Sequence, residues 1–137
     1  MHCPRCEDAY LEATYLGATA VDRCPVCMGH WFQRGELAAF LKSPTLEYFA
    51  NHYAQLRIPA VQVKTAAQCP TCQVALRRAR PKQLAEAAVD VCPRCGGTWL
   101  DGIEIQRVLM TQVKGKGFLR WILDTIEFVV TSGWRTR

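Results

Sequence analysis

Apolar and polar residues alternate in four short segments of this chain, grouped in two pairs. Residues 10–14 and 19–23 alternate in the manner of short strands and are separated by a turn at Leu16 and Gly17. Residues 74–78 and 87–91 form a second such pair, separated by a break at Arg80 and Pro81. The pattern therefore predicts two small β-hairpins, one in each half of the chain.

A helical period follows the first hairpin. It predicts a short helix over residues 36–42 and a restart at Ser43 and Pro44, which suit the N-cap and the first turn. The apolar face of this second segment, which extends to about residue 57, consists of Leu46, Phe49, Tyr53 and Leu56.

A helix is also expected after the second hairpin, from about Gly102 to Val113. Asp101 can cap it, and Glu104 at the third helical position would complete a capping box. Glu36 holds the equivalent place before the first helix, although Gln33 is a poor cap. The Glu in each half therefore has a simple interpretation as a helix-start residue.

Residues 118–130 show a third helical pattern, with an apolar stripe too wide for a solvent-facing helix. We expect an amphipathic helix that packs on the rest of the protein or contacts a partner, including a second copy of the chain. The candidate partner-contact residues on this stripe are Leu119, Ile122, Ile126 and Val129.

Eight cysteines change the picture from a small α+β protein to a metal-stabilised one. They form two sets of paired C-x-x-C turns, separated by seventeen residues in the first set and nineteen in the second. This spacing is typical of a zinc site. The expected ligands of one ion are Cys3, Cys6, Cys24 and Cys27, and those of a second ion are Cys69, Cys72, Cys92 and Cys95.

Each C-x-x-C turn, called a knuckle below, can supply two sulfurs together with backbone N–H groups that donate to the thiolates. Gly29 and Gly96 would allow a positive φ after the last ligand, although Met28 directly follows Cys27. Four thiolates leave no open position for catalytic water, so a structural zinc ion is expected in each site. A single iron for electron transfer is the alternative metal.

The two halves are repeats of one another. Trp31 and Trp99, like Glu36 and Glu104, are separated by 68 positions, and "VDRC", which ends at Cys24, recurs as "VDVC", which ends at Cys92. Each unit is too small to be stable through apolar burial alone, so bound metal is expected to supply the missing folding free energy. The two tryptophans are expected to cover the knuckles, or to contact a partner if they are exposed.

These patterns define the expected organisation of the chain. It consists of a first ribbon at 1–37, a helical segment at 38–57, a linker at 58–68, a second ribbon at 69–104, a helix at 105–113 and the amphipathic C-terminal helix at 118–130. The expected fold class is a small metal-stabilised α+β protein, in which each hairpin with two C-P-x-C knuckles is followed by a helix.

Composition adds less than the cysteines do. The formal charge is +5, but eight bound thiolates and two divalent ions would reduce it to about +1. Whole-chain charge therefore does not favour nucleic acid. The N-terminus lacks the apolar region of a signal peptide, and no apolar run could span a bilayer, so we expect a cytoplasmic protein.

The pattern C-P-x-C, hairpin, C-P-x-C-x-G-x-W-L-D-x-G-E-L resembles the TFIIB-type zinc ribbons described as "transcription factor zinc-finger" domains. The second half matches this pattern at Cys69, Cys72, Cys92, Pro93, Cys95, Gly97, Trp99, Leu100, Asp101 and Glu104. The first half matches at Cys3, Cys6, Cys24, Cys27, Gly29, Trp31, Gly35, Glu36 and Leu37, but has Phe32 and Gln33 in place of Leu and Asp. The resemblance implies the ribbon fold and zinc, and says little about function.

No nucleophile–base arrangement or phosphate-binding loop is visible in the sequence. We therefore expect a non-enzymatic protein-interaction module. The alternative is nucleic-acid binding through a basic hairpin tip made of Arg77, Arg78, Arg80 and Lys82. Asp124 and Glu127 on the tail argue against membrane attachment. Of the histidines, His2 is expected to be a disordered terminal residue, His30 a loop residue and His52 a helix-surface residue.

Overall fold

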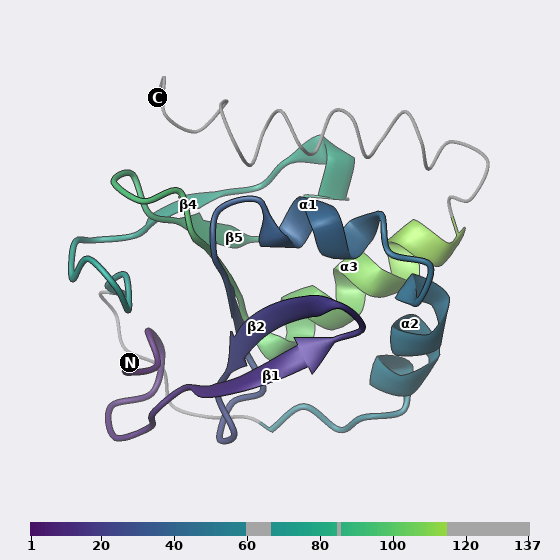
Figure 1. Cartoon of the computed structure of the whole chain (residues 1–137), viewed down its shortest axis with the longest axis horizontal. Coiled ribbons are helices and arrows are strands. Elements are labelled where there is room, and N and C mark those ends of the chain that lie inside the picture. Colours follow the sequence, from purple (N-terminus) through teal and green to yellow (C-terminus); the bar gives the residue numbers. More distant parts are fainter. Residues whose placement is uncertain (60–66, 85, 115–137) are drawn as a thin grey trace.

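The sheet at the centre of the protein unites both halves of the chain. The computed structural model describes residues 1–59, 67–84 and 86–114, and within these ranges six strands form one antiparallel sheet in the order β1-β2-β3-β6-β5-β4 (Figure 1). The strands are β1 Glu12–Leu16, β2 Thr19–Arg23, β3 His30–Phe32, β4 Arg77–Ala79, β5 Val89–Val91 and β6 Thr98–Leu100. The helices described are α1 Glu36–Leu41, α2 Leu46–Ala54 and α3 Gly102–Lys114, with a short 3-10 turn at Lys82–Leu84.

Both expected hairpins are confirmed. β1 pairs with β2 from Glu12↔Arg23 to Leu16↔Thr19, and Gly17 in the turn has a φ of 64°, which glycine adopts without strain. β4 pairs with β5 from Arg77↔Val91 to Ala79↔Val89. Strands β3 and β6 were not predicted, because three residues are too few to show an alternating pattern. The division of the chain into ribbons, linker and helical segments that we expected from the sequence remains a prediction.

The strands β3 and β6 join the two ribbons edge to edge within one sheet. They pair antiparallel, with Trp31 opposite Trp99, and His30↔Leu100 is the repeat-related counterpart of the pair Phe32↔Thr98. The repeat-related strands are β1 and β4, β2 and β5, and β3 and β6, so the strand order reads the same from either edge of the sheet when each strand is exchanged for its mate. An approximate two-fold axis therefore passes through the Trp31–Trp99 pair, and it converts each ribbon into the other.

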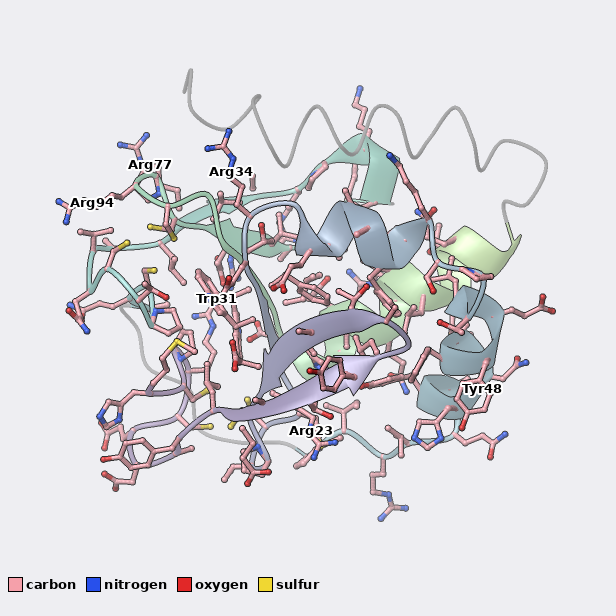
Figure 2. All side chains as sticks on the ribbon, viewed as in Figure 1. Arg23, Trp31, Arg34, Tyr48, Arg77 and Arg94 are labelled. Carbon is pink, nitrogen blue, oxygen red and sulfur yellow. The ribbon has the colours of Figure 1, made fainter. Side chains whose placement is uncertain are left out.

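Each tryptophan packs on the knuckle of the other ribbon. A Cβ added to Gly29 would overlap the ring of Trp99, and one added to Gly97 would overlap the ring of Trp31. Both indoles are fully buried, and Figure 2 shows Trp31 in the interior among other side chains. We call this reciprocal arrangement the Trp–Gly contact. The tryptophans are thus knuckle covers, as expected, but each covers the knuckle of the opposite repeat.

The sheet separates two cores. One cluster contains the knuckle cysteines with Ala9, Trp31 and Trp99, and the other lies between the sheet and the helices. Figure 1 shows α1, α2 and α3 on one side of the sheet and the N-terminal loops on the other. The helical core repeats the two-fold relation, since its repeat-related pairs are Leu37 with Ile105, Phe40 with Val108, and Leu41 with Leu109.

The two helix-start glutamates are used differently. The carboxylate of Glu36 accepts a hydrogen bond from the Gln33 N–H at 2.6 Å, but the N-cap of α1 is Gly35, which has no capping side chain, so this is not a full capping box. Glu104 instead accepts from the Ala88 N–H at 2.9 Å and so ties α3 to the loop before β5. The residue expected to cap α3, Asp101, accepts from the Trp99 indole N–H at 2.7 Å.

Helix α2 has no counterpart in the second repeat within the described residues, and it fastens to α3. The side chain of Gln106 donates to the carbonyls of Tyr53 at 2.7 Å and Leu56 at 3.2 Å, which lie at the C-terminal end of α2. α2 thereby covers the open side of the helical core. The predicted C-terminal helix at 118–130 and most of the predicted linker lie outside the described residues.

The Trp–Gly contact predicts a large stability cost for a single added methyl group. Gly29→Ala and Gly97→Ala should each lower the free energy of unfolding of the metal-loaded protein by about 2–3 kcal/mol, because the indole that fills the space must move. Gly35→Ala is the control. Its φ is 86° but open space surrounds the position, so only about 1 kcal/mol is expected. Urea denaturation at fixed zinc concentration measures all three.

The coupling to the ring can be tested separately. In a Trp99→Phe background the benzo ring that Gly29→Ala would strike is absent, so the added cost of Gly29→Ala should fall by at least half. Equal costs in both backgrounds would mean that the glycine is needed for another reason.

Candidate functional site

The structure brings each predicted set of four cysteines together. Within the described residues, the sulfurs of each set lie within 4.8 Å of one another. Three sulfur–sulfur distances stand out: 3.7 Å for Cys3–Cys27, 3.9 Å for Cys6–Cys24 and 3.7 Å for Cys69–Cys95. Four sulfurs at about 2.3 Å from a tetrahedral zinc ion would be about 3.8 Å apart. The donor sets therefore fit such an ion.

Backbone N–H groups point at the sulfurs in both sites. Cys3 accepts from the amides of Arg5 and Cys6 at 3.3 Å, and Cys92 accepts from those of Arg94 and Cys95 at 3.3 and 3.4 Å. Cys69 and Cys24 are bonded in the same way, at 3.3 to 3.4 Å. These bonds delocalise thiolate charge, as the C-P-x-C sequence led us to expect.

The thiols of each cluster cannot all ionise without a cation. The hydrogen bond from Cys27, followed by the amides of Arg5 and Cys6, lowers the pKa of Cys3 to about 5 against the opposing effect of burial. Burial raises the pKa of Cys6 and of Cys69 to about 12. A divalent ion bound among the sulfurs would supply the positive charge that four thiolates require.

The backbone after a knuckle turns into the left-handed region, but at a different residue than expected in the first ribbon. Met28 has a φ of 65°, in the place equivalent to Gly96 with a φ of 77°. Gly29, which we expected to take a positive φ, is instead required by the Trp–Gly contact. The side chain of Met28 therefore occupies a strained position that glycine fills in the second ribbon.

A buried ion-pair network ties the first knuckle to the second ribbon. The Arg5 guanidinium, 9% exposed, contacts Asp90 at 2.5 Å and Asp101 at 3.3 Å. Arg78 contacts the same two carboxylates, at 3.0 and 3.8 Å. Sequence reasoning missed this network, because the residues lie 85 positions apart and meet only across the two-fold axis.

The departure of the first ribbon from the family pattern also has a visible effect. Asp101 accepts from the indole of Trp99, whereas the equivalent residue of the first ribbon is the exposed Gln33. The buried indole nitrogen of Trp31 has no hydrogen-bond partner among the described residues. The two halves of the sheet thus have equivalent strands, but within the described part of the chain only the second provides a hydrogen-bond acceptor for its buried indole N–H.

His30 is not the loop residue that we expected. It lies in β3, is fully buried, and bonds through Nδ1 to the Met28 carbonyl at 3.0 Å and through Nε2 to the Tyr53 hydroxyl at 2.7 Å. Because the carbonyl can only accept, the proton is on Nδ1 and Tyr53 donates to Nε2. Burial lowers the pKa of His30 to about 4. Likewise, His2 forms a β-bridge with Tyr10 and packs on its ring, so it is not a disordered terminal residue.

The predicted basic tip is partly neutralised. Arg78 is engaged by Asp90 and Asp101, and Arg80 lies 3.5 Å from the Glu86 carbonyl. Arg77 and Lys82 are exposed, and Figure 2 shows Arg77 projecting to solvent at the same end of the molecule as Arg94. The predicted partner contacts Leu119, Ile122, Ile126 and Val129 lie outside the described residues and stay a prediction.

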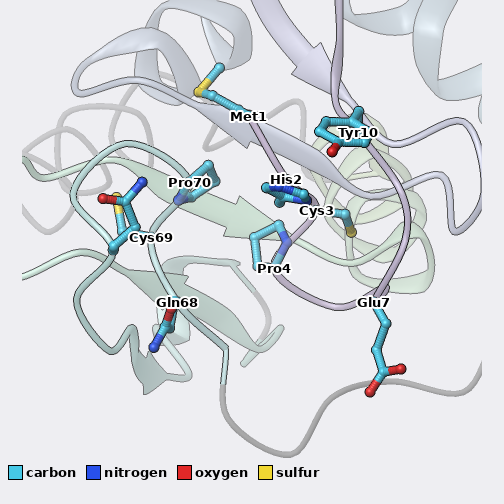
Figure 3. A pocket seen from close by; sticks show the side chains of 10 residues that line it. Met1, His2, Cys3, Pro4, Glu7, Tyr10, Gln68, Cys69 and Pro70 are labelled. Carbon is cyan, nitrogen blue, oxygen red and sulfur yellow. The ribbon is translucent and has the colours of Figure 1, made fainter.

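A groove of about 750 Å³ lies between the first knuckles of the two ribbons. Figure 3 shows His2 and Pro4 facing Pro70 across it, with Glu7 extending away at the rim. No pattern in the sequence predicts this groove, because its walls come from both repeats. Its lining residues are Met1, His2, Cys3, Pro4, Glu7, Tyr10, Gln68, Cys69, Pro70 and Gln73.

Comparison with known families agrees with the geometry. The family model described as "Transcription factor zinc-finger", a TFIIB-type zinc ribbon, matches residues 2–43 and 68–110, which is more than half of the chain. The chain therefore belongs to this zinc-ribbon family and carries two tandem copies of the domain. Neither the search of curated proteins nor that of solved structures gave a match. Within the described residues, no helix has the length and apolar character needed to cross a membrane.

Metal content should follow the two clusters. Native mass spectrometry of untagged protein should find two zinc ions per chain, and Cys24→Ser or Cys92→Ser should each leave one tightly bound ion, because three sulfurs bind more weakly than four. Removal of both ions by a chelator should unfold the sheet, which circular dichroism will detect. Two iron atoms would instead support electron transfer.

Acid should destabilise the protein through His30. Its pKa in the folded protein lies below its ordinary value, so the unfolded chain takes up a proton first as the pH falls. Stability should be complete above about pH 6.5 and should decline toward pH 4, by roughly 3 kcal/mol at most. An NMR titration of the imidazole of the zinc-loaded protein checks this. A midpoint near 6.5 would contradict it.

Proposed function

We propose that this chain binds two zinc ions and acts, without catalysing a reaction, as a module that binds a polypeptide in the groove between its two first knuckles. The observation that carries the proposal is the chemistry of the groove. The ten described residues that line it include aromatic, proline, methionine and glutamine side chains, but no lysine or arginine. Such a lining suits a polypeptide better than a nucleic acid, which needs cations.

Tyr10 supports this choice most directly. Its side chain is 61% exposed beside the groove, and its ring packs against His2, with 4.3 Å between the ring centroids. Exposed tyrosines that are held in place are frequent anchors of protein interfaces, because they bury a large area at a small entropic cost. The groove therefore offers a ready contact surface on a rigid, metal-stapled support.

The zinc ions have a structural role in this proposal. Four sulfurs occupy all the positions of a tetrahedral ion, so neither site leaves room for a reacting water. The one fully buried histidine, His30, is bonded on both ring nitrogens, which removes it as a general base. These facts favour binding over catalysis.

Nucleic-acid binding is the second candidate, favoured by Arg77 and Arg94, which both project from one end of the molecule (Figure 2). It is weaker because Arg78 and Arg80 of the predicted basic tip are engaged by groups of this chain. Arg77 and Arg94 are exposed, so they can be changed without disturbing the core.

A displayed library of random peptides, selected against the zinc-loaded protein, tests the proposal. Selected peptides should lose at least tenfold in affinity with Tyr10→Ala, because a truncated aromatic anchor costs about 1–2 kcal/mol or more. Tyr48→Ala is the matched control. It removes an equally exposed tyrosine, 67% against 61%, from α2 on the helical side of the sheet and should change nothing.

Two results would contradict the protein-binding function. One is equal binding of the selected peptides by wild type, Tyr10→Ala and Tyr48→Ala proteins. The other is salt-sensitive binding of an oligonucleotide that is lost in the Arg77→Ala, Arg94→Ala double variant, with no peptide selected. The second result would establish the nucleic-acid alternative.

A further inference from the structure

The two four-cysteine sites differ in their access to solvent. All four cysteines of the first site are buried, and the most exposed of them, Cys6 and Cys27, reach only 6%. In the second site, Cys69 and Cys92 are 1% exposed, but Cys72 and Cys95 are only partly buried. Two cysteines of one site are therefore partly exposed to solvent, whereas none of the other site is.

The first knuckle of the first site is held down by Arg5. This side chain lies between the two cysteines of the knuckle in sequence and anchors in Asp90 and Asp101 of the other ribbon. The equivalent residue in the second site is Thr71, which is exposed and whose hydroxyl contacts the Met1 sulfur at 3.7 Å. The knuckle that carries Cys72 is thus without the buried ionic anchor of its repeat mate.

The second knuckle of the first site is also covered. A Cβ on Gly102, at the start of α3, would meet the carbonyl oxygen of Cys27 at 2.9 Å and the side chain of Ile58 at 2.8 Å. The start of α3 therefore packs closely on the loop that carries Cys27, with Ile58 beside the same glycine. Two features thus shield the first site from solvent. Arg5 covers its first knuckle, and the start of α3 at Gly102 covers its second.

From these differences we infer that the second site is a thiol-modification site. Hydroperoxides and other soft electrophiles react with Cys72 and Cys95 and release the metal ion of that site, while the first site keeps its ion because Arg5 shields it. The inference rests on the zinc-binding part of the proposed function. In this inference the ion of the first site is structural, and the ion of the second site can be released.

The chemistry balances with the two exposed sulfurs and one hydroperoxide. The first thiolate attacks a peroxide oxygen, so that an S–O bond forms, the O–O bond breaks and hydroxide leaves. The second thiolate attacks that sulfur, which forms the S–S bond and expels a second hydroxide. The two sulfurs together supply two electrons. They lie within the 4.8 Å span of the site and come from different knuckles, and their loss as ligands leaves the ion with two sulfurs.

The test uses the intact two-zinc protein and limiting hydrogen peroxide, with native mass spectrometry and peptide mapping as readouts. We expect loss of one zinc ion, retention of the other and a disulfide between Cys72 and Cys95. In a parallel reaction, iodoacetamide should alkylate Cys72 and Cys95 at least tenfold faster than Cys6 and Cys27. Similar rates for the two sites, or earlier loss of the first ion, would overturn the inference.

Arg5→Ala tests the cause of the protection. Asp90 keeps Arg78 as a partner in this variant, so the sheet should persist and two zinc ions should still bind. The first ion should then be lost at least threefold faster, with new labelling of Cys6, and an unchanged rate would overturn the role given to Arg5. Protein that holds no metal before the reagent is added would contradict zinc binding itself, whereas equal reactivity of two loaded sites contradicts only this inference.

Discussion

The contact between each tryptophan and the glycine of the opposite repeat is the constraint on which the rest of this structure depends. Trp31 can cover the Gly97 loop, and Trp99 the Gly29 loop, only if β3 and β6 pair in the register that places the two tryptophans opposite each other. That register joins two three-stranded halves into one sheet. A single ribbon would leave its indole in water and its glycine loop uncovered, and this explains why the chain carries the pattern twice.

Metal and packing stabilise different parts of the same unit. The sulfurs gather the knuckles around the two tryptophans on one face of the sheet, and the helices bury the other face. Because the knuckles press on the tryptophans at the two-fold axis, loss of either ion would also loosen the joint between the repeats. Folding and metal binding are therefore linked across the whole described part of the chain.

The approximate symmetry makes the differences between repeats informative. At three equivalent places the first repeat has Arg5, Met28 and Gln33, and the second has Thr71, Gly96 and Asp101. Each difference alters the surroundings of a knuckle or a tryptophan. One metal site is consequently buried and fastened by a buried ion pair, and the other is partly open. The two repeats share one scaffold, and these few positions give their metal sites and tryptophans different surroundings.

The sequence alone determined the two cysteine sets, the two hairpins, the helices that follow them up to Lys114 and the zinc-ribbon family, because these depend on local spacing and on the periods of strand and helix. Only the tertiary structure decided that the ribbons share one sheet, that each tryptophan crosses to the other repeat and that Arg5 reaches Asp90. It also placed His30 in the core and created the groove between the first knuckles. These features arise where segments distant in sequence meet across the two-fold axis or between sheet and helices, and no local pattern records such meetings.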